Sequence, residues 1–145
     1  MNMMSGLHPL LFAIFPIFLL FSQNLDSLTP KDIIFPLILF LGITITSLLI
    51  LYYIFKNSVK SGIVISLLWV IFFSYGYIFA VFDISIFQDI YYIQQHALLM
   101  TPFLGVLIVG ILIIVKTKRK LNNATTIITV MAIALIVFPA VNITT

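Results

Sequence analysis

Ionisable side chains that could do chemistry gather in one segment of this chain, between residues 83 and 96. Asp83, Asp89 and His96 could supply carboxylate and imidazole groups for acid–base chemistry or for holding a metal ion. Asp89 and His96 are seven positions apart, which on a helix separates their backbones by about 10 Å. Because their functional groups would not meet, we expect a solvated polar face on the outer side of a membrane rather than a catalytic or metal site.

The remaining polar side chains are scattered within apolar runs. His8 precedes Pro9, and we expect it to be an interfacial residue rather than a ligand. Hydroxyl groups inside apolar helices usually bond to a carbonyl one turn back or bridge to a neighbouring helix. The alternative is that four of them line a polar path for a solute: Thr44, Ser47, Ser74 and Thr101. We expect no catalytic residue, no metal ligand and no cofactor.

The composition decides which solvent surrounds the chain. Of its 145 residues, 63% are hydrophobic and 8% are charged, whereas a soluble domain is close to half apolar and a quarter charged. Most of the chain must therefore be solvated by lipid. There are no cysteines, which excludes disulfides and thiolate metal sites. The net charge of +3 is too small for a nucleic-acid footprint, so we expect no nucleic-acid partner.

Five apolar runs are long enough, or nearly so, to cross a hydrocarbon core, which takes roughly 20 residues. We expect them to form transmembrane helices over residues 7–22, 33–55, 63–82, 97–115 and 124–141. Residues 84–96 place apolar side chains on one helical face and polar side chains on the other, which predicts an amphipathic helix lying in the membrane interface. The expected fold is an all-α membrane bundle, a single domain of five transmembrane helices plus one interfacial helix.

The start of the second run carries a helix-capping signature. Thr29 has the chemistry of an N-cap, Pro30 suits the first helical position, and Asp32 follows three residues after Thr29. This pattern predicts a capping box, with the Asp32 carboxylate at the positive end of the helix dipole.

The charged residues predict how the chain is threaded. Basic residues in short connections stay in the cytoplasm, and all but Lys31 lie in the second and fourth connections. These six topology anchors are Lys56, Lys60, Lys116, Lys118, Arg119 and Lys120, whereas the four acidic residues lie in the other two connections. We therefore expect a multi-pass protein of the cell membrane with a cytoplasmic N-terminus and an extracytoplasmic C-terminus.

Several segments along the chain also resemble a known family. The segments are residues 8–18, 22–24, 27–33, 72–76 and 96–102, with Phe138 and Pro139 before Asn142. Together they resemble the N-terminal membrane module of prokaryotic sulfatase-like proteins of the alkaline phosphatase superfamily. The resemblance implies that an extracytoplasmic hydrolase domain with metals and a nucleophile follows the module. This chain stops at Thr145, where that domain would begin, so no catalytic residue of the family has a matching position here.

Three functions follow as hypotheses. The first is a non-enzymatic anchor or scaffold in the bilayer, associated with an extracytoplasmic partner such as a sulfatase-like hydrolase or with further copies of itself. The second is a component that transports a small solute or handles a lipid. The third is an enzyme at the outer interface that uses Asp83, Asp89 and His96.

Overall fold

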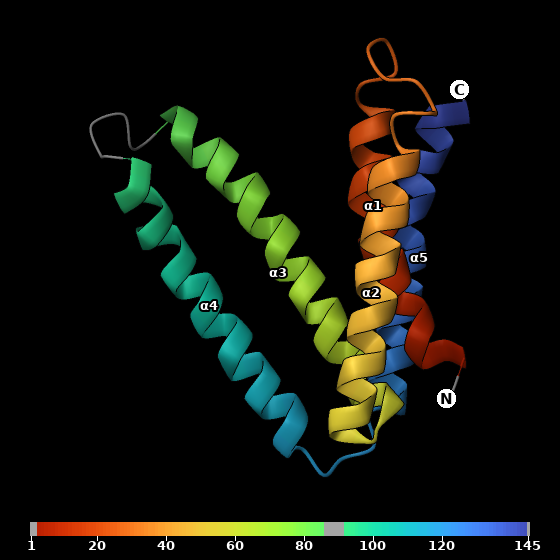
Figure 1. Ribbon diagram of the computed structural model, residues 1–145, viewed down its shortest axis with the longest axis vertical. Helices are drawn as coiled ribbons and strands as arrows, with labels where there is room; N and C mark the ends of the chain where they lie inside the picture. The colour runs from red at the N-terminus through yellow and green to blue at the C-terminus, as the bar shows by residue number, and fades with distance from the viewer. Residues whose placement is uncertain (1–2, 86–91, 145) are drawn as a thin grey trace.

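The computed structural model describes the backbone of residues 3–85 and 92–144 and the side chains of residues 6–81 and 96–143. Every regular element within these ranges is an α-helix: α1 (Met3–Ser22), α2 (Ile34–Phe55), α3 (Ser58–Ser85), α4 (Tyr92–Lys116) and α5 (Asn122–Thr144) (Figure 1). The prediction of an all-α protein is confirmed for the part of the chain that the structure describes.

The lengths and compositions of these helices suit a bilayer. Among the described residues, four helices are long and apolar enough to cross a membrane: Ile34–Phe55, Ser58–Val81, His96–Lys116 and Asn122–Ile143. Helix α1 contributes a shorter apolar stretch, Gly6–Ser22. The structure is thus that of a helical, multi-pass membrane protein.

The start of α2 corrects one sequence prediction. The Asp32 carboxylate accepts hydrogen bonds from the Thr29 N–H (2.7 Å) and the Thr29 hydroxyl (2.8 Å), as one half of a capping box would. Residues 29–33 nevertheless form a turn, and α2 begins only at Ile34. Pro36 gives the physical reason, because a helix that started at Pro30 would press the Pro36 ring against the Asp32 carbonyl. With the start at Ile34, Pro36 falls in the first turn, where no N–H is needed.

The bounds of α3 and α4 differ from the hydropathy runs. Helix α3 begins at Ser58 because the side-chain oxygen of Asn57 caps it, accepting a 3.1 Å hydrogen bond from the Lys60 N–H. It continues to Ser85, and α4 begins at Tyr92. Both ends of the expected interfacial helix at 84–96 therefore belong to α3 and α4, and residues 86–91 lie outside the described residues. A hydropathy run ends where the side chains leave the hydrocarbon of the membrane. A helix can extend beyond that point, because its backbone hydrogen bonds continue outside the hydrocarbon as well.

Helix α1 is central to the packing. It contacts α5, α3 and α2, while α4 packs mainly against α3. In Figure 1, α1 lies alongside both α2 and α5, and α3 and α4 lean away from these helices as a pair. Where α4 crosses α3, Gly110 gives the Leu67 side chain room, because a Cβ at Gly110 would lie 2.6 Å from Leu67 Cδ2.

Small side chains allow α1 and α5 to approach closely. The buried face of α5 carries Thr125, Thr129, Ala132 and Pro139. The Thr129 hydroxyl donates a 2.8 Å hydrogen bond to the Thr125 carbonyl, so its polarity is satisfied within the helix. Because association in lipid depends on packing rather than on the hydrophobic effect, such a face is what joins two membrane helices.

Candidate binding cavity between α1 and α3

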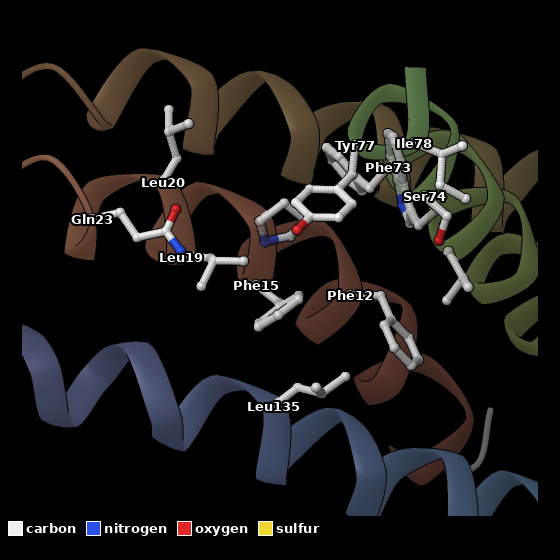
Figure 2. A pocket seen from close by; sticks show the side chains of 13 residues that line it. Phe12, Phe15, Leu19, Leu20, Gln23, Phe73, Ser74, Tyr77, Ile78 and Leu135 are labelled. Carbon is white, nitrogen blue, oxygen red and sulfur yellow. The ribbon is translucent and has the colours of Figure 1, made fainter. Parts of the chain in front are cut away.

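A hollow lies between α1 and α3, where α3 diverges from α1. Its volume is about 570 Å³, within the range of small-molecule sites in proteins. Figure 2 shows side chains of α1 and α3 turned toward each other across this cavity, with Leu135 of α5 along one side. Most of the lining is aromatic or aliphatic: Phe12, Phe15, Pro16, Leu19, Leu20, Trp69, Val70, Phe73, Tyr77, Ile78 and Leu135.

A few polar groups accompany this apolar lining. Gln23 supplies an amide at the end of α1, and Ser74 and Tyr77 supply hydroxyls from α3. A cavity with apolar walls and a few polar groups suits a ligand that has an apolar body and a polar end.

Two prolines interrupt the helix hydrogen bonds of residues that line the cavity. Pro16 lies inside α1 and Pro139 inside α5. Since proline has no N–H, the carbonyls four residues earlier, those of Phe12 and Leu135, receive no amide hydrogen bond from the following turn. Both of these residues line the cavity. Phe12 and Leu135 are far apart in the sequence, and only the fold brings them to one cavity.

An aromatic cluster of Trp69, Phe73 and Phe40 lies at the wall of the cavity that α3 forms. Trp69 donates its indole N–H to the Thr44 hydroxyl oxygen (2.9 Å), and that hydroxyl donates to the Phe40 carbonyl (2.6 Å). The Trp69 ring stacks on Phe73 with 5.6 Å between ring centroids and packs against Phe40 at 5.2 Å. These contacts hold α3 against α2 at the wall of the cavity that Trp69 and Phe73 form.

His8 is buried between the helices, and its expected position in the membrane interface stays a prediction, because burial inside the protein does not give its depth in the bilayer. Its Nδ1 lies 2.6 Å from the Ser66 hydroxyl, which links α1 to α3. The His8 side chain is 0% exposed, and among the described residues no hydrogen-bond partner reaches its Nε2.

The sequence predicts an outer polar face made of Asp83, Asp89 and His96, and of these three side chains the structure describes only that of His96. The His96 Nδ1 and the Tyr75 hydroxyl are 2.5 Å apart, and the imidazole stacks on Phe79 with 4.0 Å between centroids. His96 therefore ties α4 to α3. The Asp83 and Asp89 side chains lie outside the described residues. Within the described side chains, no group of three or more His, Cys, Asp and Glu residues could hold a metal ion.

The four hydroxyls of the suggested solute path lie in different places. Thr44 is buried between α2 and α3, and Ser74 lines the α1–α3 cavity. Ser47 lies on the outward side of α2, whereas Thr101 is exposed on α4 and donates to the Ala97 carbonyl. These residues do not line a common path.

The topology anchors collect at one end of the molecule. The connections α2–α3 and α4–α5 both lie at the lower end in Figure 1. Lys56 lies in the α2–α3 connection and Lys118 to Lys120 lie in the α4–α5 connection, whereas Lys60 lies in the first turn of α3 and Lys116 is the last residue of α4. The Lys60 ammonium donates to the Val115 carbonyl (2.6 Å) and to the Thr117 carbonyl (3.0 Å). The α1–α2 connection, with Asp26 and Asp32, lies at the opposite end.

The fold and the cavity place this chain in a general class of proteins: multi-pass helical membrane proteins with an apolar cavity between two helices. Comparison of the chain with protein-family models, with curated proteins and with solved structures found no match. The sulfatase-like resemblance stays a prediction.

Proposed function

We propose that this chain is a non-enzymatic membrane module that anchors or scaffolds an extracytoplasmic partner. The kind of partner that the resemblance implies is a sulfatase-like hydrolase. The proposed threading places the N-terminus and the basic connections in the cytoplasm and the C-terminus outside. The collection of basic residues at one end of the fold supports this threading, because short basic connections stay inside.

The observation that supports this proposal is the shape of the outward face of α2. This face has a shallow hollow lined by Ile38, Leu39, Gly42, Ile43, Thr46 and Ser47. No heavy atom of the described chain, beyond the residue's own neighbours and helix backbone, lies within 4 Å of a Cβ built at Gly42. Gly42 and Thr46 are four residues apart on α2, which is the spacing of small residues at which membrane helices approach closely. The hollow therefore supports docking of a transmembrane helix from a partner.

Single cysteine substitutions can test this docking face. The chain has no cysteine of its own, so no other thiol of this chain can react. Thr46→Cys places a thiol in the hollow, and Ile133→Cys places one on an exposed face near the middle of α5 as the matched control. Attachment of a maleimide-linked benzophenone to the thiol, photocrosslinking in native membranes and mass spectrometry are expected to capture an extracytoplasmic hydrolase through residue 46 and not through residue 133.

Two outcomes would overturn this proposal. No product at residue 46 would remove the docking face. A product that contains only second copies of this chain would remove the hydrolase and leave a homo-oligomer.

The cavity between α1 and α3 favours a second candidate, a lipid-handling component. Its apolar walls match an acyl chain, and Gln23, Ser74 and Tyr77 could meet a polar headgroup. The separate positions of Thr44, Ser47, Ser74 and Thr101 count against the solute-path form of this hypothesis. A lipid found bound between α1 and α3, together with the absence of any crosslinked protein at residue 46, would favour this function over scaffolding.

A further inference from the structure

A second hollow lies at the end of the molecule opposite the α1–α2 connection, between the α2–α3 and α4–α5 connections. Its volume is about 480 Å³. Four of the seven basic residues of the chain line it, and no carboxylate is among its lining residues in the described structure. The polar and charged residues that surround it are Asn57, Lys60, Thr117, Lys118, Arg119, Lys120 and Asn122.

Lys60 gives this hollow its shape. Its ammonium bonds to the carbonyls of Val115 and Thr117, at 2.6 and 3.0 Å, and so holds the end of α4 against the start of α3. The exposed carbonyls at the end of α4 carry the negative end of its dipole, which the Lys60 charge offsets. The basic run from Lys118 to Lys120 is thereby brought beside α3.

Two helix starts add to the positive potential of the hollow. Helix α3 begins at Ser58, directly after Asn57, and α5 begins at Asn122. The first amide groups of a helix have no carbonyl partner within it, and this end of the helix carries the positive end of the dipole. Because Asn57 and Asn122 both line the hollow, these dipoles act together with Lys118, Arg119 and Lys120, whereas the Lys60 charge is offset by the carbonyls at the end of α4.

We propose that this hollow binds the phosphate-bearing headgroup of an anionic lipid. The charge is complementary, and the Arg119 guanidinium can bind phosphate oxygens in a bidentate manner. The hollow lies at the ends of helices that are apolar enough to cross a bilayer, so it sits at the level of lipid headgroups. Basic pockets between membrane helices are known to hold such headgroups. The site does not depend on the scaffold function.

Two double variants distinguish binding in the hollow from general electrostatic attraction of anionic lipid to this end of the molecule. Lys118→Gln/Arg119→Gln removes two positive charges from the lining, and Lys56→Gln/Lys116→Gln removes two from the same end of the molecule but outside the lining. Binding of phosphatidylglycerol and of phosphatidylcholine is measured by native mass spectrometry in a neutral detergent, with inorganic phosphate added as a competitor in a separate arm.

The site predicts a preference for phosphatidylglycerol over phosphatidylcholine in the unaltered protein. The lining variant should bind phosphatidylglycerol about 25-fold more weakly, since each basic residue near a headgroup contributes roughly fivefold. The control variant should lose less than about threefold, since charges outside the hollow are more strongly screened.

Three results would overturn the proposal. Equal losses in both variants would show diffuse attraction and no site. Absence of any preference for the anionic lipid would remove the headgroup as ligand. Occupation by inorganic phosphate without binding of phosphatidylglycerol would assign the hollow to free phosphate.

Discussion

Trp69 on α3 donates its indole N–H to the Thr44 hydroxyl on α2 over 2.9 Å, and both side chains are buried. In lipid, a polar group without a partner is costly, so this bond specifies which faces of α2 and α3 meet. It also fixes one wall of the α1–α3 cavity, because Trp69 lines it.

Removal of this bond should destabilise the protein. Thr44→Val leaves the Trp69 N–H without its acceptor and should lower the free energy of unfolding by about 1 kcal/mol, as expected for a hydrogen bond between membrane helices. Thr46→Val makes the same change on the exposed side of α2 and should have almost no effect. The measurement is unfolding in mixed micelles, with a Thr44→Val/Trp69→Phe cycle to isolate the coupling. A coupling energy of zero would show that the bond contributes nothing.

The Asp32 carboxylate should make the α1–α2 connection sensitive to acid. Hydrogen bonds from the Thr29 N–H and hydroxyl lower the pKa of Asp32 below its usual value. A carboxyl group with a lowered folded-state pKa contributes stability that is fully present above its unfolded pKa of about 3.9 and is lost as pH falls through the folded pKa. Asp32→Asn should remove this acid dependence, whereas Asp26→Asn should keep it. Hydrogen exchange of residues 29–33 between pH 6 and pH 2.5 reports the change, and identical profiles for the parent and Asp32→Asn would contradict it.

Lys56 should be replaceable by glycine with a gain in stability. It caps the end of α2 with φ 49°, in the left-handed region, and its N–H donates to the Tyr52 carbonyl. Residues other than glycine are strained in this conformation because of their Cβ. Lys56→Gly should therefore raise the free energy of unfolding by about 0.5–1 kcal/mol. Lys116→Gly makes the same change inside the last turn of α4 and should lower it by a similar amount. A loss of stability at both positions would argue against the left-handed cap.

Filling the α1–α3 cavity should displace an apolar ligand. Ser74→Trp introduces a large ring into the lining, whereas Thr101→Trp places the same ring on the exposed side of α4. Native mass spectrometry after mild extraction should show about tenfold less bound lipid for Ser74→Trp than for Thr101→Trp, because an overfilled cavity excludes its ligand. Equal retention by the two variants would show that the cavity holds no lipid.

The sequence predicts the helices better than their ends. A long run without charges can only be a helix in lipid, so the all-α architecture follows from composition. The third apolar run begins at residue 63, after the polar residues Ser58, Lys60 and Ser61, whereas α3 begins at Ser58. Asn57 is a sequence signal for this earlier start, since asparagine is among the preferred helix caps.

The cavity and the buried bonds could not be predicted in the same way. His8 and Ser66 are 58 residues apart along the chain, and no local pattern relates them. Helices surrounded by lipid are apolar on nearly all sides, so periodicity does not show which face turns inward. The lean of α3 and α4 away from α1 is therefore a property of packing alone.

The central claim is that the apolar helices lie in a bilayer with the basic connections on the cytoplasmic side. The absence of native cysteine allows a direct test with two exposed positions that carry no charge, Ser27→Cys in the α1–α2 connection and Asn123→Cys at the start of α5. A thiol reagent that cannot cross membranes should label residue 27 in intact cells and residue 123 only after lysis. Labelling of residue 123 in intact cells, or recovery of either variant in the soluble fraction, would contradict the account.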